Sequence, residues 1–403
     1  MKTIFRNLAL FALVLGFAVP MSFGAGQGGK YLLFVGTYTN SDSKGTGSKG
    51  IYSYNFDEAS GKLTSWGVAA ETANPSFLAV APGNKLLYAV NELQKYQGAA
   101  SGGVTAFALD RKSGKLTQLD EVASHGADPC YISFDKTGKF ALVANYTGGT
   151  VAVFPLSSDG HIGEASSVQN DEGALGPNKE RQEHSHAHWI EVSARNRFAY
   201  VADLGLDRVL IYKFDASKGA LIRAESPSGK AASNSKDFFS ATLAPGTGPR
   251  HVAFSQDGKF MYVLGEMDST VTVFANKSNE TFESIQKISA LPSGFSGKND
   301  AAEIVIHPNG KFLYTSNRGD DSIAVFAIDR ATGKLSSVEH VPSGGKTPRN
   351  FAIDPAGTHL LVANEETGNI VEYQIDRATG KLTSEHEVAK VPAPVCLVFV
   401  ALD

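Results

Sequence analysis

Residues 248–266 read GPRHVAFSQDGKFMYVLGE, and this stretch decides the predicted fold. The apolar runs HVAF and FMYVL flank the segment SQDGK, which predicts a strand, a tight turn and a second strand. Gly258 supplies the backbone dihedral angles that such a turn requires. Arg250 and His251 stand just before the first strand, and Glu266 stands just after the second.

The same strand–turn–strand pattern recurs along most of the chain, with different residues at the strand ends. Six copies begin at Asn74, Asp128, Ala187, Gly248, Ala302 and Thr347. A third strand rich in β-branched and aromatic residues follows most copies, for example at residues 150–154 and 322–326. A fourth strand then follows a turn such as Gly333-Lys334-Leu335. Units of four strands at a period of about 50 residues are typical of β-propeller blades.

The two chain ends together predict a seventh blade. Residues 31–37 match a second strand, residues 50–56 a third strand and residues 62–64 a fourth strand, but no first strand precedes them. Residues 394–399 match a first strand and nothing more. We therefore expect an all-β, seven-bladed β-propeller whose C-terminal strand joins the N-terminal blade. This closure of the ring would remove the exposed sheet edge.

The N-terminal residues predict a secretory leader. Lys2 and Arg6 precede an apolar run at residues 8–19 that is too short to span a bilayer, and residues 22–24 fit a cleavage site. We expect residues 1–24 to be a signal peptide and residues 25–403 to form the propeller domain. The mature chain is then periplasmic or extracellular, with no membrane contact after leader removal. An uncleaved membrane anchor is the alternative.

The composition excludes some classes of function. The chain of 403 residues has 10% aromatic residues, 42% hydrophobic residues and a formal net charge of −4. These values fit a β-rich globular protein, and no nucleic-acid partner is predicted because no cluster of Lys or Arg stands out. Cys130 and Cys396 are too few for a disulfide framework, so we expect two free and mostly buried thiols.

The strand ends of successive blades are expected to meet at one mouth of the central channel. In an antiparallel blade, the start of strand one and the end of strand two share an edge, and strand one lines the channel. Three consecutive blades place ionisable residues there: His186, His188, Arg250, His251, Glu266, Glu303 and Arg318. Charged groups in a shared, partly desolvated cleft are costly unless they are paired or used. This convergence predicts a functional site.

A second set of residues, at the end of strand two, is rich in Asn and Asp. Its members include Asn91, Asn145, Asp203, Asn317 and Asn364. Their side chains can cap the following turn through hydrogen bonds to the backbone, which is the main role expected for the set.

Arginines and histidines at this mouth make a cationic pocket suited to a carboxylate or a phosphate. The predicted catalytic residues are His188, Arg250, His251 and Glu266. The predicted substrate-binding residues are His186, Glu303, Arg318, Asp203, Asn145 and Arg349. Glu266 or His251 would activate water, and His188 or an arginine would stabilise the oxyanion of an ester or lactone. A serine hydrolase is not expected, because the chain has no Gly-x-Ser-x-Gly sequence.

No cofactor is predicted, although two metal sets stay open. His186-Ala-His188 together with Asp203 could bind zinc, but spacing fixes no third ligand. Glu303, Asn317 and Asp203 could instead bind calcium.

The blades also carry a resemblance to a known family. The segments HAHWIEVSARNRFAYVADLGLDRVLIY, GPRHVAFSQDGKFMYVLGEMDSTVTVF and AAEIVIHPNGKFLYTSNRGDDSIAVF, with GTYT at residues 36–39 and TPRNFAID at 347–354, resemble the seven-bladed β-propeller lactonases. That family contains a 6-phosphogluconolactonase and a fungal carboxymuconate-cyclising enzyme. The resemblance covers residues 31–399 and implies a lactonase active site at the channel mouth. Ser185 departs from it, because the family often has Pro before the first His of this motif.

The resemblance implies a 6-phosphogluconolactonase-type hydrolase that opens an anionic sugar lactone, either 6-phosphogluconolactone or a related aldonolactone. A signal peptide would separate the protein from the cytosolic sugar-phosphate pathway, so the substrate stays open. The alternatives are a carboxymuconate-type cycloisomerase and a non-catalytic binding propeller in the periplasm. We expect the chain to act as a monomer.

Overall fold

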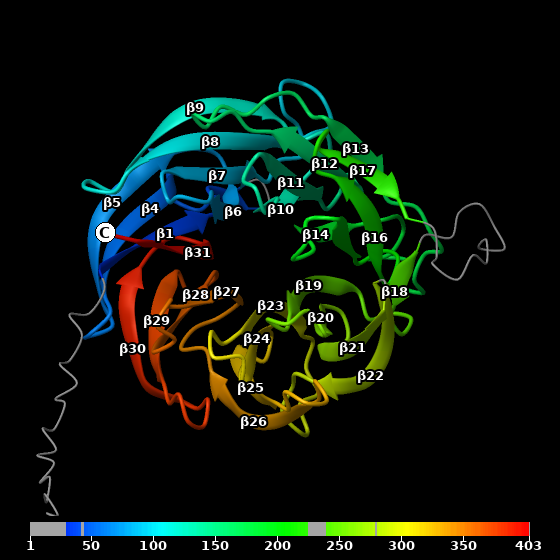
Figure 1. The fold of residues 1–403 in the computed structure, drawn as a ribbon. Coiled ribbons are helices and arrows are strands. Elements are labelled where there is room, and N and C mark those ends of the chain that lie inside the picture. The colour runs from blue at the N-terminus through cyan, green and yellow to red at the C-terminus, as the bar shows by residue number, and fades with distance from the viewer. Residues whose placement is uncertain (1–29, 42–43, 225–238, 279, 403) are drawn as a thin grey trace, which may run out of the picture.

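Seven antiparallel sheets, six of four strands and one of five, stand in a ring around a central axis in the computed structural model of the chain (Figure 1). The structure describes residues 30–41, 44–224, 239–278 and 280–402, and the described residues contain no helix. The predicted signal peptide lies outside these residues. The expected all-β, seven-bladed propeller is confirmed.

The strands of each blade follow one another from the centre of the ring outward. The innermost strands are β6 (Pro75–Val80), β10 (Pro129–Phe134), β14 (Ala187–Val192), β19 (Pro249–Phe254), β23 (Asp300–Ile306), β27 (Pro348–Ile353) and β31 (Pro394–Ala401). The second strands are β1 (Lys30–Thr37), β7 (Leu86–Asn91), β11 (Phe140–Asn145), β15 (Phe198–Asp203), β20 (Phe260–Gly265), β24 (Phe312–Arg318) and β28 (His359–Asn364).

The third and fourth strands complete the blades. The third strands are β4 (Gly50–Asp57), β8 (Gly103–Asp110), β12 (Thr150–Pro155), β16 (Arg208–Asp215), β21 (Thr270–Ser278), β25 (Ser322–Ile328) and β29 (Asn369–Ile375). The outermost strands are β5 (Lys62–Glu71), β9 (Lys115–Ala123), β13 (Ser167–Asn170), β17 (Ala220–Arg223), β22 (Thr281–Ser289), β26 (Leu335–Pro342) and β30 (Leu382–Lys390). Beyond this scheme, β18 (Ser240–Thr242) pairs with β16, and β2 (Asn40–Ser41) pairs with β3 (Lys44–Gly45).

The chain ends close the ring as expected. Strand β31 pairs antiparallel with β1, with Tyr31 opposite Ala401 and Gly36 opposite Cys396. The C-terminal strand is therefore the innermost strand of the N-terminal blade, and it supplies the pairing partner that β1 would otherwise lack on that side.

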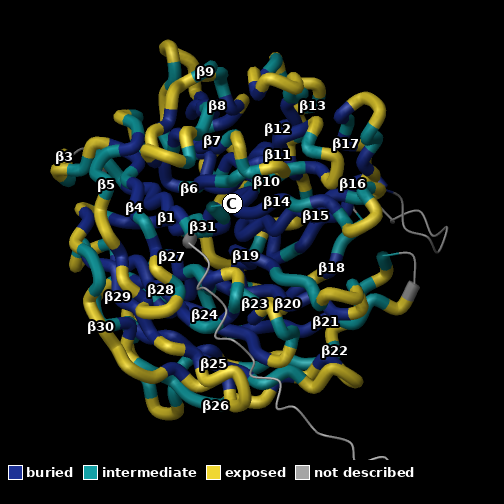
Figure 2. Tube along the Cα trace, turned by 60° about the vertical axis from the view of Figure 1, so that its left-hand side comes forward, coloured by how far each residue is buried: buried dark blue, intermediate teal, exposed yellow. Residues whose placement is uncertain are grey.

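Burial falls from the centre of each blade to its rim (Figure 2). Residues of β11, β20 and β28 are all buried, because neighbouring blades cover both faces of these strands. The outer strands β9 and β30 are largely exposed or half-buried. Buried tyrosines of three second strands donate hydrogen bonds to glycine carbonyls of the next blade, from Tyr88 to Gly160, Tyr262 to Gly333 and Tyr314 to Gly380. These bonds and the apolar packing hold the blades together.

Glycines in the turn between strands one and two adopt the conformation that the sequence predicts. Gly138, Gly258 and Gly310 all have a φ of 68°. This left-handed region is costly for residues with a Cβ, so glycine is suited to the turn.

Every innermost strand has a β-bulge near its start, where one or two residues have no partner in the ladder to strand two. The unpaired residues are Ser76, Cys130, His188, Arg250, His251, Ala302, Glu303, Arg349 and Val395. A bulge bends the strand and re-aims a side chain. The bulge therefore explains how residues at the start of strand one come to face a common opening.

Candidate functional site

A polar cavity of about 300 Å³ lies at the end of the ring where the innermost strands begin and the second strands end. It is lined by Glu92, Cys130, Tyr146, Arg181, His188, Arg250, Glu266, Arg318 and Arg349. These residues come from six of the seven blades and from the segment before β14. Four guanidinium groups face two carboxyl groups, so positive charge is in excess.

The cavity brings together half of the ten predicted site residues. Those that line it are His188, Arg250, Glu266, Arg318 and Arg349. Of the seven ionisable residues expected to converge, four therefore share one cavity: His188, Arg250, Glu266 and Arg318. The other five predicted residues do not line this cavity, and their side chains have different partners, as described below.

Glu266, which follows β20, is the carboxylate around which three of the arginines gather. Its Oε2 lies 3.0 Å from Arg250 Nη1 and 3.2 Å from Arg318 Nη2, and its Oε1 lies 2.5 Å from Arg181 Nη2. Burial by itself raises the pKa of the Glu266 carboxyl, but the charges of Arg318 and Arg250 lower it well below its usual value. Glu266 is therefore ionised and a weak base, suited to holding the arginines in place.

Arg318, at the end of β24, is buried and still positively charged at neutral pH. Burial lowers the pKa of its guanidinium to about 10, and the charge of Glu266 opposes this effect. Its Nε and Nη2 donate to the carbonyls of Asp300 and Ala301, at 3.2 and 3.3 Å. These two bonds fix the guanidinium at the cavity wall.

His188, in β14, is a neutral imidazole with its hydrogen on Nδ1. Arg250 Nη1 donates a hydrogen bond to His188 Nε2, and since a guanidinium accepts none, Nε2 must carry a lone pair. Burial and the adjacent charge of Arg250 lower the pKa of His188 well below its usual value. Glu266 Oε2 lies 3.8 Å from the same nitrogen. The cavity thus holds a neutral imidazole beside a permanent negative charge.

Cys130 and Cys396 are free and buried, as expected. Cys130 Sγ lies 3.6 Å from His188 Nδ1, so a histidine from the next blade stands beside the thiol. That nitrogen already carries a hydrogen and cannot take the thiol proton. Burial also raises the pKa of Cys130 well above its usual value, which makes it a poor nucleophile.

Arg349 and Glu92 form a second charged group in the same cavity. Arg349 Nη2 donates to Tyr38 Oη at 2.7 Å, and Tyr38 in turn donates to Glu92 Oε1 at 2.8 Å. Arg349 Nη2 lies 3.9 Å from the same carboxylate oxygen. Burial raises the pKa of Glu92, and its Oε2 has no hydrogen-bond partner among the described residues. This part of the cavity therefore holds a cation beside a buried carboxylate.

Arg181 reaches the cavity from the long segment between β13 and β14, outside the blade repeat. Besides Glu266, its guanidinium lies 3.4 Å from Asp300 Oδ1 and 3.4 Å from Tyr146 Oη. About a third of its side chain is exposed, 36%. Arg181 therefore stands at the rim, between the buried arginines and solvent. The sequence contained no signal for it, because the repeat alignment does not extend into this segment.

His251 and Glu303 lie beside this cavity and form a buried pair. His251 Nδ1 lies 2.8 Å from Glu303 Oε1, and Asn350 donates to Glu303 Oε2 at 2.6 Å. The imidazole packs edge-on against His188, with ring centroids 5.4 Å apart, and against Tyr131. Its Nε2 is buried without a partner among the described residues. The His251 ring, held by Glu303, therefore packs against the His188 ring and helps to fix its position.

Of the remaining three predicted residues, Asn145 and Asp203 form hydrogen bonds with backbone groups. Asn145 donates to the Ser124 carbonyl at 3.0 Å, and Asp203 accepts from the amides of His186 and Leu206 at 2.9 and 3.0 Å. Asp203 therefore caps the turn that follows it, the main role expected for its set, whereas Asn145 ties the end of β11 to the preceding blade connection and to Thr150.

The structure assembles neither metal set that spacing left open. The imidazole of His186 stacks on Tyr146 and has Glu183 as its neighbour. His186 and His188 therefore face different partners, and Oδ1 of Asp203 accepts from two backbone amides. Ligating atoms of these three residues are not grouped in the described part of the chain. In the calcium set, Glu303 is committed to His251 and Asn350. Asn317 donates to the Ala290 carbonyl and to Ser322.

The buried histidines make a pH-dependent contribution to stability. Burial lowers the pKa of His251, whereas Glu372 raises the pKa of His359 against the effect of burial. In the unfolded chain both titrate near about 6.5. The contribution of neutral His251 is full above that pH and is lost as pH falls, and that of His359 is full below it and is lost as pH rises.

We therefore expect His251→Gln to cost less stability near pH 5 than near pH 7.5, by about 1.4 kcal/mol for each pKa unit of lowering. His359→Gln is the matched control and should cost more near pH 5. Melting temperatures of the two variants and the wild type at both pH values test this. A shift of the same sign in both variants would contradict it.

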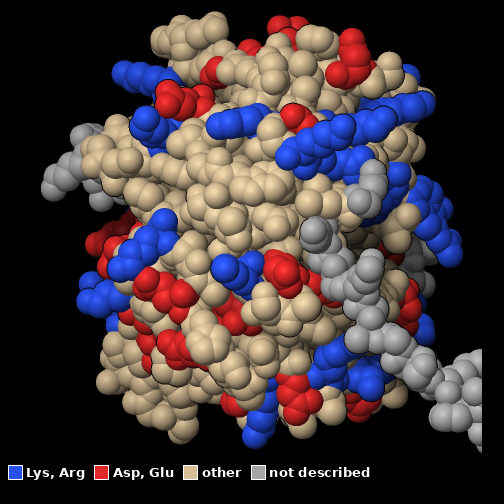
Figure 3. All heavy atoms as spheres, turned by 90° about the vertical axis from the view of Figure 1, so that its left-hand side faces the viewer, with Lys and Arg blue, Asp and Glu red and all other residues tan. Residues whose placement is uncertain are grey.

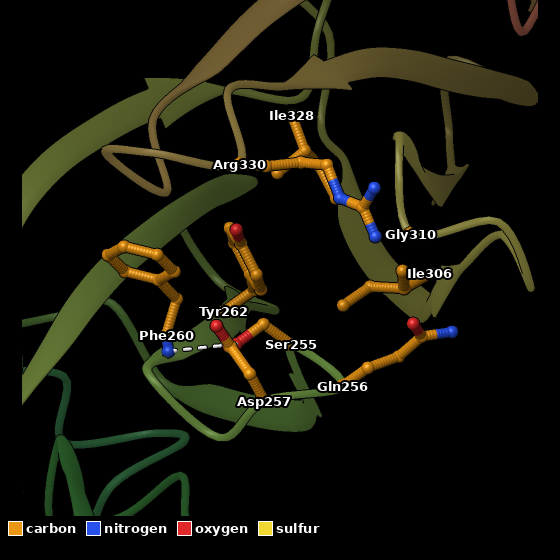
Figure 4. A pocket seen from close by; sticks show the side chains of 9 residues that line it. All are labelled: Ser255, Gln256, Asp257, Phe260, Tyr262, Ile306, Gly310, Ile328 and Arg330. Atoms are coloured by element: carbon orange, nitrogen blue, oxygen red, sulfur yellow. Dashed lines mark hydrogen bonds between the residues drawn. The ribbon is translucent and has the colours of Figure 1, made fainter.

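A second cavity, of about 140 Å³, lies between the blade of β19–β22 and the blade of β23–β26, at the opposite end of the strands (Figure 4). Tyr262, Ile306, Ile328 and Arg330 are among the side chains around it. It lies beside the turn between β19 and β20, and none of its lining residues is a histidine. It therefore lacks an imidazole such as that of His188 in the first cavity. Positive and negative side chains are interspersed over the outer face shown in Figure 3, without the cationic excess of the first cavity.

A model of the family "Lactonase, 7-bladed beta-propeller" matches residues 32–399. A 6-phosphogluconolactonase of Bacillus subtilis is 37% identical over 322 residues, which are 80% of this chain and 84% of that protein. One from Formosa agariphila is 36% identical over 326 residues, 79% and 85% of the two chains.

A solved structure shows the same architecture. The periplasmic gluconolactonase of Pseudomonas aeruginosa is 33% identical and superimposes with a TM-score of 0.83, covering 93% of this chain and all of that one. Within the described residues, no helix is long and apolar enough to cross a membrane.

Proposed function

Since the chain belongs to the seven-bladed β-propeller lactonase family, we propose that it hydrolyses an anionic sugar lactone in the cavity lined by His188 and the four arginines. 6-Phosphogluconolactone or a related aldonolactone is the proposed substrate. The observation that carries the proposal is the convergence of Arg181, Arg250, Arg318 and Arg349 in one cavity. Guanidinium groups bind carboxylates and phosphates through paired N–H donors.

In the proposed reaction, His188 is the general base. The lactone carbonyl oxygen replaces His188 as acceptor for Arg250 Nη1, which leaves the lone pair on Nε2 free for water. Water attacks the carbonyl carbon, His188 takes its proton, and Arg250 stabilises the oxyanion. The ring C–O bond then breaks and the proton passes to the leaving alkoxide. Glu266, 3.8 Å from Nε2, stabilises the imidazolium that forms in between.

The division of roles differs from the simplest expectation. Glu266 is one candidate for the base, but the charges of the arginines around it lower its pKa and make it a weak base, so we assign it the positioning of those arginines. His251 was the other candidate, and we assign it, with Glu303, the support of the His188 ring. Asn145, Asp203 and His186 are left out of the proposed substrate contacts, because they do not line the cavity.

Neither alternative function is favoured by the comparisons. A cycloisomerase would use the same cations on an unsaturated dicarboxylate, and a binding propeller would need no base. A periplasmic location is part of the proposal, supported by the leader-like residues 1–24 and by the periplasmic gluconolactonase to which the chain is similar. Action as a monomer stays a prediction.

The substrate class is tested by comparing a phosphorylated and an uncharged gluconolactone, with muconate-type diacids beside them. We expect lactone hydrolysis, with Arg318→Ala raising KM for the phosphorylated lactone by about 10- to 100-fold, the worth of a charged hydrogen bond. KM for the uncharged lactone should change little. Arg330→Ala, in the cavity at the other end of the strands, is the control. No lactone turnover, or turnover of the diacids alone, would reject the proposal.

A further inference from the structure

Three side chains just before β14 form a cluster that the lactonase cavity does not use. Ligating atoms of Glu183, His184 and His186 all lie within 4.8 Å of one another. None of the three lines the cavity. Glu183 and His184 are half-exposed, with 46% of each side chain accessible, while His186 is buried. The cluster therefore lies at the rim, with one anchored and two accessible members.

The hydrogen bonds of the two imidazoles fix where their lone pairs point. His184 Nδ1 lies 2.7 Å from the Ser185 carbonyl, and His186 Nδ1 lies 3.1 Å from the Tyr146 carbonyl. A carbonyl only accepts, so each Nδ1 carries the hydrogen and each neutral ring has its lone pair on Nε2. Such outer bonds orient imidazole ligands in metal sites.

Both lone pairs face the same carboxylate oxygen. Glu183 Oε1 lies 3.3 Å from His184 Nε2 and 3.2 Å from His186 Nε2. Three acceptors this close repel one another unless a cation lies among them. A proton on one Nε2 would relieve only one of the two contacts with Glu183. A metal ion satisfies all three atoms at once.

The spacing suits a small tetrahedral ion. Zinc binds His nitrogen at about 2.0–2.1 Å, and tetrahedral angles then separate the ligand atoms by roughly 3.4 Å. The distances from Glu183 Oε1 to His184 Nε2 and to His186 Nε2, 3.3 and 3.2 Å, are already close to this value. His186 is held by stacking on Tyr146, with ring centroids 4.5 Å apart, and the His184 ring packs against His186 with centroids 4.1 Å apart. Of the two rings, the exposed His184 is the one that would move when a metal ion binds.

We propose that Glu183, His184 and His186 bind a divalent transition-metal ion of the zinc type, with water in the fourth position. The ligand set differs from the pair of His186 and His188 with Asp203, which the fold does not assemble. The same segment carries Arg181, which contacts Glu266. Metal binding would therefore hold Arg181 at the cavity rim. The proposal does not depend on the lactonase activity, because it concerns residues outside that cavity.

Calorimetric titration of the untagged, EDTA-treated protein with zinc chloride tests the site. We expect one zinc ion per chain, and His184→Ala and Glu183→Gln should each weaken binding by more than the roughly 10- to 100-fold that loss of an outer hydrogen-bond partner costs. His161→Ala is the matched control, because His161 is also half-exposed and lies 2.7 Å from Asp120 and 4.0 Å from Asp159. It should bind zinc like the wild type.

Each outcome decides the proposal. Saturable binding that is lost in both cluster variants and kept in His161→Ala supports it, as does a zinc anomalous peak between the three side chains in a crystal. The absence of saturable binding, or binding that follows His161, overturns it. Melting curves in metal-free buffer show whether the variants are folded, which we expect since both substituted side chains are half-exposed.

Discussion

Replacing His188 by glutamine is expected to lower kcat for lactone hydrolysis by about 10²- to 10⁴-fold, the usual contribution of a general base. Glutamine has a similar size and can still accept a hydrogen bond from Arg250, so the arginine cluster should keep its arrangement. It cannot take a proton from water. The loss should therefore fall on kcat, with KM changed much less.

The pH profile separates this role from a structural one. Burial and the charge of Arg250 lower the pKa of His188, so the wild-type rate should be flat at neutral pH and fall only in acid as the imidazole is protonated. His188→Gln should lack this acid limb. His307→Gln is the matched control, because His307 is a buried histidine whose Nε2 bonds to the Gly357 carbonyl outside the cavity. A variant that keeps the wild-type rate, or the same acid limb, would exclude His188 as the base.

The repeat predicted the ring because two-stranded hairpins with apolar strands can bury both faces only when neighbouring blades cover them. The closure by residues 394–399 was also predictable, since the N-terminal blade lacked a first strand. What spacing alone could not show was the bulge at His188, Arg250 and Arg349. A regular strand would alternate side chains between its faces, whereas the unpaired residue is re-aimed.

The candidate site was predictable where it belongs to the repeat and not where a loop supplies it. Glu92 and Tyr146 stood in the position after strand two, but nothing in their neighbours singled them out from other loop residues. Arg181 lies in a segment without periodicity, and only the fold places it against Glu266. Conversely, Asn145 is a plausible ligand by position, yet its amide donates to the Ser124 carbonyl and to the Thr150 hydroxyl.

Replacing Glu266 by glutamine is expected to lower the free energy of unfolding by about 3–5 kcal/mol, because it leaves buried guanidinium groups without their counter-charge. The side chain keeps its size, so no cavity is created, and the cost is electrostatic. Arg250 and Arg318 are both buried around it, with 5% and 14% of their side chains exposed. The expected result is a clear drop in melting temperature in buffer free of multivalent anions.

Added phosphate should restore more stability to Glu266→Gln than to the wild type. In the variant the anion takes the place of the lost carboxylate, whereas in the wild type it competes with Glu266 for the same N–H donors. Ligand at about 100 times its Kd stabilises by about 2.7 kcal/mol. Glu372→Gln is the control: it removes a buried carboxylate that lies 2.6 Å from His359 and outside the cavity. It should lose stability without this additional gain. A phosphate shift in Glu266→Gln no larger than the shift in Glu372→Gln would mean that the arginines around Glu266 do not form an anion site, and the proposed substrate class would fail with it.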